Sequence, residues 1–310
     1  MIILKKSKYG YNYFMKYIDT HIHGAFGVNF NTGNFNEIKS LLKEFKKRNI
    51  VAICPTLVGD SIENLQERFK LFKKIKNEHS EDECYIIGLH LEGTFLNHNK
   101  PGIQDSRVFL EPKIENFQKL ANNFEDIIKI VTLAPELDED NEFAKYLENK
   151  NIRAHAGHTL ATSKGAASAT THHFNAMPPL SHRGENLALD TIINNKVYCE
   201  IIADGVHVSD NMLRLFFKLK NNKKIIMISD ALPAAGSKIE IEFCGKKISP
   251  EGKDSKGTLA GSVKLLDEIT NYVIDKKIIT KEEAKDYVFN NPLEHLNLEK
   301  TEKSYIKNLA

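Results

Sequence analysis

The 310-residue sequence lacks several features that would assign it at once to a class. It has no long apolar run, and its first residues, MIILKKSKYGYNYFMKY, hold no apolar segment of the secretory kind, so we expect neither a membrane span nor a cleaved leader. Its 4 cysteines show no CxxC spacing, which favours free thiols in a reducing compartment over disulfides. The net charge of +2 is spread over interspersed lysines and glutamates and indicates no nucleic-acid partner. We therefore expect a globular, cytoplasmic protein.

Short apolar, β-branched runs alternate with segments of helical periodicity. The runs are YIDTHIH (17–23), IVAICPT (50–56), CYIIGLHLEG (84–93), IIKIVTLAPE (127–136), IRAHAGHT (152–159), ATTHHFN (169–175), VYCEIIADG (197–205) and IIMISDA (225–231). Between them apolar residues recur at helical spacing, as Ile38, Leu41, Leu42 and Phe45 do. This alternation predicts an α/β fold, a (β/α)8 barrel. An open, doubly wound sheet is the alternative, but no GxGxxG motif follows the first strand.

The sequence predicts three parts: a short N-terminal segment (1–16), a barrel (17–297) and a C-terminal tail (298–310). After the eighth strand, residues 237–260 combine short strand patterns with glycine-rich turns, which predicts a β-hairpin insertion over the barrel mouth. A helix is expected from about Val263, and Thr280 with Glu283 predicts a capping box at the start of another. No internal repeat or low-complexity tract is present.

Polar residues gather where the predicted strands end. Asp19, His21 and His23 end the first, His90 and Glu92 the third, His158 the fifth, His172 and His173 the sixth, Asp204 and His207 the seventh, and Asp230 the eighth. In a barrel these ends meet at one rim, and so many imidazoles and carboxylates are costly to bury unless they are paired or bind a cation. His21 and His23 lie two apart on a strand and therefore face the same side. The pattern predicts a site for zinc, iron or another divalent ion.

These residues, in this order, resemble the metal-dependent amidohydrolases, and among them the N-acetylglucosamine-6-phosphate deacetylases. The matching segments are DTHIHG (19–24), GLHLEGTFLN (88–97), AGHTLA (156–161), THHFNAMPPLSHRGE (171–185), IIADGVHVS (201–209), ISDALPAAG (228–236) and GTLAGS (257–262). Together they span nearly the whole chain. Thr94 stands where the family usually has proline. The family also carries an accessory β-sandwich, which we expect to be reduced or absent here.

The resemblance implies roles for particular residues. The metal ligands would be Glu92, His158 and His172, with His21 and His23 as ligands of a second ion in members that hold two. Asp230 would be the catalytic aspartate, and His207 would contact the substrate and polarise its carbonyl. Asn175, Ala176 and Arg183 would bind the sugar phosphate. His155 and His182 receive no role, His173 at most a supporting one, and Asp204 and Glu136 are interpreted as structural.

The resemblance also implies a reaction and partners. The reaction is hydrolysis of N-acetylglucosamine 6-phosphate to glucosamine 6-phosphate and acetate, with one or two zinc or iron ions activating water. Asp230 would take the proton of the water and later deliver it to the leaving amine. The partner is a small amino sugar phosphate, and we expect a homodimer with Arg183 serving its own site or that of its neighbour.

Two alternatives stay open. The first is another amidohydrolase, such as a dihydroorotase or a nucleoside deaminase. A dihydroorotase would carry a carbamylated lysine at the end of the fourth strand, and IIKIVTLAPE has no lysine there. The second is a degenerate barrel that binds sugar phosphates without catalysis, although all the expected ligands and Asp230 are present.

Overall fold

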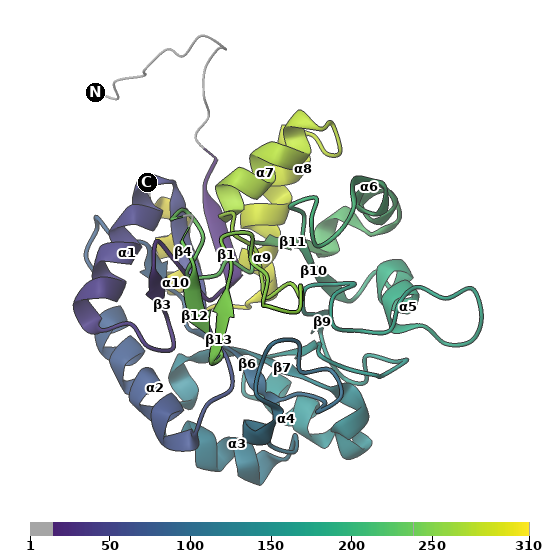
Figure 1. Cartoon of the computed structure of the whole chain (residues 1–310), viewed down its shortest axis with the longest axis horizontal. Helices are drawn as coiled ribbons and strands as arrows, with labels where there is room; N and C mark the ends of the chain where they lie inside the picture. Colours follow the sequence, from purple (N-terminus) through teal and green to yellow (C-terminus); the bar gives the residue numbers. More distant parts are fainter. Residues whose placement is uncertain (1–14, 238, 310) are drawn as a thin grey trace.

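A parallel sheet wrapped into a barrel forms the centre of the computed structural model, which describes residues 15–237 and 239–309 (Figure 1). Its strands, in spatial order, are β1 (Tyr17–Ile22), β4 (Ile50–Leu57), β6 (Leu89–Phe95), β7 (Ile128–Leu133), β8 (Arg153–Ala156), β9 (Ala169–Thr170), β10 (Tyr198–Ile202) and β11 (Ile225–Ile228). A parallel bridge between Ile22 and Ala231 links the last strand to the first. The predicted (β/α)8 barrel is confirmed.

Helices surround the sheet (Figure 1). They are α1 (Phe35–Lys47), α2 (Ile62–Asn77), α3 (Ile114–Ala121), α4 (Glu142–Asn149), α5 (Leu187–Ile193), α6 (Asp210–Leu219), α7 (Leu266–Asp275), α8 (Lys281–Lys285), α9 (Asn291–His295) and α10 (Lys300–Asn308). A π-helical segment, Asp286–Asn290, joins α8 to α9, and the predicted capping box at Thr280 is formed. The connection from β8 to β9 departs from the regular alternation, because it contains no helix. None of the described helices combines the length and apolar character needed to cross a membrane.

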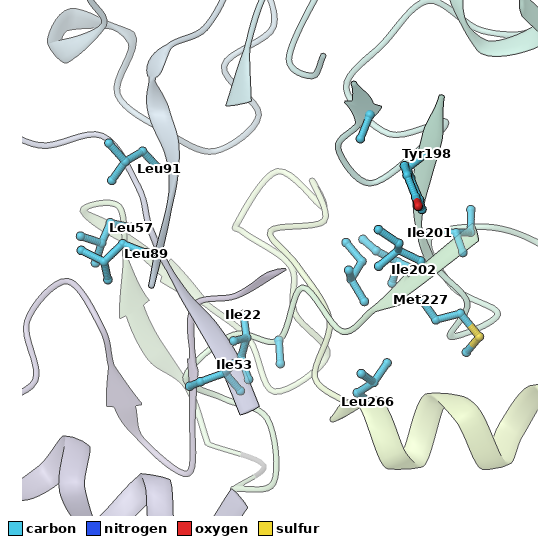
Figure 2. Close-up of a cluster of buried hydrophobic side chains, with 14 of the residues drawn as sticks. Ile22, Ile53, Leu57, Leu89, Leu91, Tyr198, Ile201, Ile202, Met227 and Leu266 are labelled. Atoms are coloured by element: carbon cyan, nitrogen blue, oxygen red, sulfur yellow. The ribbon is translucent and has the colours of Figure 1, made fainter. Parts of the chain in front are cut away.

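Capping and a buried stripe together explain why a segment such as α1 is helical. The Asn34 side chain accepts hydrogen bonds from the backbone N–H groups of Asn36 and Glu37, and the Glu37 carboxylate accepts from the Asn34 N–H. Its apolar residues, at helical spacing, are buried against the sheet, each contributing roughly 1.5–3 kcal/mol. Figure 2 shows buried side chains that the strands contribute to the same apolar core, such as Ile53 of β4.

The predicted insertion is an antiparallel hairpin of β12 (Ile241–Phe243) and β13 (Lys246–Ile248). Phe243 and Ile248 pack with Val58 and Ile103, so the hairpin is held against the loops that follow β4 and β6. Besides the barrel, the sheets in residues 15–237 and 239–309 are this hairpin and the short pair β2 (Gly24–Ala25) and β3 (Val28–Asn29). No accessory sandwich occurs in that part of the chain.

The predicted C-terminal tail contains an ordered helix. Ile306 of α10 and Leu309 just after it are buried, in one apolar cluster with Ile18 of β1 and Val51 of β4. The helix therefore packs on the barrel itself. The division into 1–16, 17–297 and 298–310 stays a prediction.

Candidate metal centre and active site

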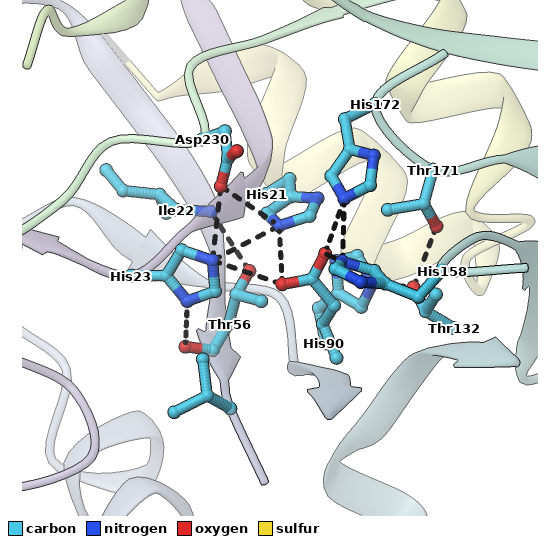
Figure 3. A network of polar contacts seen from close by, with 12 residues as sticks. His21, Ile22, His23, Thr56, His90, Thr132, His158, Thr171, His172 and Asp230 are labelled. Carbon is cyan, nitrogen blue, oxygen red and sulfur yellow. Dashed lines mark hydrogen bonds and ion pairs between the residues drawn. The ribbon is translucent and has the colours of Figure 1, made fainter. Parts of the chain in front are cut away.

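Five side chains at the carboxyl ends of the barrel strands converge on one point (Figure 3). His21 lies in β1 and His23 directly follows it, Glu92 lies in β6, and His158 and His172 follow β8 and β9. All five are buried, since none is more than 6% exposed. Parallel strands bring their carboxyl ends to one rim, which explains how residues distant in sequence meet here.

Glu92 stands between two pairs of imidazoles and offers one oxygen to each. Its Oε2 lies 3.4 Å from His21 Nε2 and 3.3 Å from His23 Nε2. Its Oε1 lies 3.2 Å from His158 Nε2 and 2.8 Å from His172 Nε2. The two groups, His21–His23–Glu92 and Glu92–His158–His172, each have ligand atoms within 4.8 Å of one another. Two adjacent cation sites that share a bridging carboxylate fit this arrangement.

The hydrogen bonds behind the imidazoles fit a cation as well. His158 Nδ1 faces the backbone oxygen of Lys100 at 2.8 Å, and His23 Nδ1 faces that of Thr56 at 3.3 Å. A carbonyl oxygen can only accept, so each Nδ1 carries the proton and each Nε2 turns a lone pair toward Glu92. Imidazole and carboxylate donors suit zinc or iron. The residues present therefore fit a divalent metal, whose identity they do not define.

Three site residues hold a left-handed backbone conformation. The φ angles are 48° at His158, 29° at His172 and 50° at Asp230, each just beyond the end of a barrel strand. Such conformations cost of order 1–3 kcal/mol each for a non-glycine residue and cluster at functional sites. Here the sharp turn aims each side chain back over the barrel mouth.

Asp230 lies on the His21–His23 side of Glu92. Its Oδ1 is 3.1 Å from His23 Nε2 and 3.3 Å from His21 Nε2. Burial acts to raise the pKa of the Asp230 carboxyl, but the imidazoles of His21 and His23 outweigh it and lower the pKa. For Glu92, too, burial raises the pKa, and the surrounding imidazoles hold it well below its usual range. Both carboxyl groups are therefore ionised and able to bind a cation or accept a proton.

His207 approaches the site from the loop after β10 and is held by Asp204. The carboxylate of Asp204 accepts the backbone N–H of His207 at 2.9 Å and lies 2.9 Å from its Nδ1. Burial opposes the charged form of the His207 imidazole, but the Asp204 carboxylate raises its pKa above the ordinary value. His207 can therefore act as a charged hydrogen-bond donor. Asp204 has the structural role that the sequence suggested.

A pocket of about 390 Å³ opens over these groups. Its lining includes the metal-binding candidates His23, Glu92, His158 and His172, together with Asp230, His207, Asn175 and Ala176. The insertion closes one side with Phe243, whose ring centre lies 5.3 Å from that of His23, and with residues 258–261. The pocket over the candidate metal centre is thus bounded in part by a segment outside the barrel strands.

Arg183 does not line this pocket. It lies exposed in the loop between β9 and α5, where its backbone N–H donates to Ser181 Oγ at 3.2 Å. The structure therefore brings nine of the ten sequence-predicted site residues together at the barrel mouth and leaves Arg183 apart.

Three other histidines lie outside the candidate metal centre. His173 Nδ1 contacts Thr170 Oγ1 at 2.9 Å, and its ring packs toward α6. His155 is buried within the barrel, with its Nε2 2.7 Å from His295 Nε2. His182 is exposed.

Two further carboxylates organise the site: Glu136, which the sequence indicated as structural, and Glu200, which sequence reasoning missed. Glu136 accepts hydrogen bonds from Asn97 Nδ2 at 2.7 Å and from the Leu160 N–H at 2.6 Å, so it ties the loop after β6 to the loop that carries His158. Glu200 is fully buried in β10 beneath His21. A charged residue inside the otherwise apolar run VYCEII was the signal that could have identified it.

Comparison with known proteins agrees with this geometry. Residues 14–280 match the model of the Amidohydrolase family, and the chain belongs to that family. It is 31% identical to the N-acetylglucosamine-6-phosphate deacetylase of Bacillus subtilis, over 81% of this chain and 67% of the relative. It is 30% identical to the enzyme of that name from Haemophilus influenzae, over 85% of this chain and 72% of the relative. A crystal structure of N-acetylglucosamine-6-phosphate deacetylase from Pasteurella multocida superimposes with a TM-score of 0.81 at 26% identity, covering 91% of this chain and 76% of that one.

Proposed function

We propose that the protein hydrolyses N-acetylglucosamine 6-phosphate to glucosamine 6-phosphate and acetate. The observation that carries the proposal is the placement of Asp230 beside the paired imidazoles that flank Glu92, in the lining of a pocket of about 390 Å³. Relatives of that name, similar over most of the chain, support the choice of substrate.

The metal would be held by His21, His23, Glu92, His158 and His172, with Glu92 shared between two ions. When bound there, a divalent zinc or iron ion would supply a hydroxide nucleophile at neutral pH and polarise the amide carbonyl. The amino acids named above would hold it in a site shielded from bulk water, where electrostatic effects are stronger.

Two residues would move or place charge in the reaction. Asp230, ionised, takes a proton from the attacking water and delivers it to the leaving nitrogen, so that the amine departs neutral. His207, kept protonated by Asp204, donates a hydrogen bond to the oxygen that becomes negative in the transition state.

The phosphate would be bound by Asn175 and Ala176 in the pocket and by Arg183. Because Arg183 lies outside its own pocket, we propose that it acts in a homodimer, at a neighbour's site. In such a homodimer a partner would cover exposed apolar side chains near this loop, such as Ile193 of α5 at 61% and Leu219 of the neighbouring α6 at 48%. The free cysteines support a cytoplasmic location.

Acetate release tests the proposal. The metal-loaded protein is incubated with N-acetylglucosamine 6-phosphate and, separately, with N-acetylglucosamine, and acetate and primary amine are measured. We expect equal amounts of both products from the phosphorylated sugar, little from the other, and loss of activity with a chelator. Binding of the phosphorylated sugar without acetate would identify a degenerate barrel, and hydrolysis of a cyclic amide instead would identify a different amidohydrolase.

A further inference from the structure

Glu200 is a fully buried carboxylate inside the barrel, directly beneath the candidate metal centre. Its Oε1 accepts a hydrogen bond from the Thr20 hydroxyl at 2.8 Å. Its Oε2 faces two imidazole nitrogens, His21 Nδ1 at 3.6 Å and His155 Nδ1 at 3.5 Å. Since β10 is not a neighbour of β1 or β8 in the sheet, these contacts cross the barrel interior.

No lysine or arginine of residues 15–237 and 239–309 pairs with the Glu200 carboxylate. Among the described residues its only ion-pair contacts are His21 and His155. Glu200 Oε2, His21 Nδ1 and His155 Nδ1 are also buried atoms without any hydrogen-bond partner in that part of the chain. A buried carboxylate needs compensating positive charge, and no lysine or arginine among the described residues supplies it to Glu200.

Because Glu200 is a carboxylate, it influences which nitrogen of each facing imidazole carries the proton. An ionised carboxylate only accepts and repels a nitrogen lone pair, so it favours the tautomers of His21 and His155 in which the facing Nδ1 carries the proton. His21 Nε2 then turns its lone pair toward Glu92 and Asp230. His155 Nε2 is likewise an acceptor for His295 Nε2, 2.7 Å away. With a cation bound, His21 would thus be a neutral imidazole whose Nδ1 proton faces Glu200 and whose Nε2 lone pair faces the cation.

We propose that Glu200 is a positioning residue that fixes the tautomer and orientation of His21, and thereby sets the affinity of the His21–His23–Glu92 group for a cation. The inference rests on the metal centre of the proposed function and deepens it. The cation, acting through His21, provides the positive charge that Glu200 otherwise lacks. Carboxylates behind metal-binding histidines act in this way, and their loss weakens metal binding by about 10–100-fold.

The test is a metal titration of the metal-free protein, with Zn²⁺ as the probe, in Glu200→Gln and in the unaltered chain. The amide of glutamine can present an N–H to His21 Nδ1, which favours the tautomer whose Nε2 carries the proton and faces the ion. We expect binding at the His21–His23–Glu92 group to weaken about 10–100-fold, while binding at the Glu92–His158–His172 group changes little. Glu200→Asp, which keeps an acceptor-only group, should restore part of the affinity.

Two controls separate this role from support of the fold. Glu83→Gln makes the same change at another buried carboxylate, which pairs with Lys39 away from the site, and should leave both affinities unchanged. The thermal midpoint of the metal-free Glu200→Gln variant should not fall, because the substitution removes a charge that only the cation compensates. A fall in that midpoint, with metal affinity unchanged, would show a structural role and overturn the proposal.

The titration also distinguishes failure of the proposed role of Glu200 from failure of the proposed metal centre. If the unaltered chain binds Zn²⁺ at the His21–His23–Glu92 group and Glu200→Gln binds it equally well, the role of Glu200 is refuted while the metal centre stands. If the unaltered chain holds no ion in that group, both are refuted.

Discussion

Replacement of Asp230 by asparagine would test the proposed chemistry with little disturbance of the fold. Asp230 adopts a left-handed backbone with φ of 50°, a conformation in which asparagine is as acceptable as aspartate. Its backbone N–H donates to the His21 oxygen at 2.9 Å, and this bond between β1 and the end of β11 does not involve the side chain. The variant should therefore fold and keep the barrel closed.

The expected loss follows from the single function that an amide lacks. The asparagine side chain of the Asp230→Asn variant would retain an oxygen near His21 and His23, and the five metal-binding candidates are untouched, so metal should stay bound. An amide cannot accept the proton of water. General acid–base catalysis contributes about 10²–10⁴-fold, which corresponds to roughly 3–5 kcal/mol of transition-state stabilisation.

The assay combines kcat for acetate release with the metal content of the same sample. Asp140→Asn is the matched control, because Asp140 has a φ of 52° and is exposed, away from the pocket. It should leave kcat unchanged. A kcat near that of the unaltered protein in Asp230→Asn, with metal retained, would remove Asp230 from the mechanism.

Three further predictions use the same assays. Metal-loaded protein should hold more than one ion per chain, and a His21→Ala/His23→Ala double variant should lose one of them. A stoichiometry of one in both proteins, by elemental analysis, would contradict the two-ion site. Arg183→Ala should lower kcat/KM for the phosphorylated sugar by roughly 2 kcal/mol, the range of a charged hydrogen bond, without affecting the unphosphorylated one. Equal losses on both sugars would instead indicate support of the fold. In Asp204→Asn the basic limb of the kcat/KM pH profile should move to lower pH, because the imidazolium of His207 loses the carboxylate that raises its pKa. An unshifted limb would show that His207 does not act in its charged form.

Features that depend on near neighbours in the chain were accessible from the sequence. A helix that buries one face has apolar residues at the helical period, as Ile38, Leu41, Leu42 and Phe45 show. The alternation of such helices with β-branched runs predicts the barrel. The ligand candidates were accessible for the same reason. A histidine or carboxylate at the end of a strand is a local sequence pattern. Because all strands of a parallel barrel end at the same rim, these side chains lie close together there.

Features that depend on contacts between distant segments were decided only by the tertiary structure. The sequence indicated that Glu92 binds metal, but only the folded chain places one of its oxygens against His21 and His23 and the other against His158 and His172. The helix α10 has few apolar residues, so it was expected to be a tail, and its burial depends on the surface that β1 and β4 offer it.

Arg183 and Glu200 both show that the sequence does not determine which distant groups a side chain meets. Arg183 stands within a motif that indicates phosphate binding, yet its loop leads it away from the pocket of its own chain. Glu200 carries no motif, yet the barrel surrounds it with His21, His155 and Thr20. A sequence pattern defines which chemical groups are available and on which side of a strand they lie. The partner that each group meets is determined by the packing of segments far apart in the chain, because the energies of burial, charge compensation and hydrogen bonding depend on those distant neighbours.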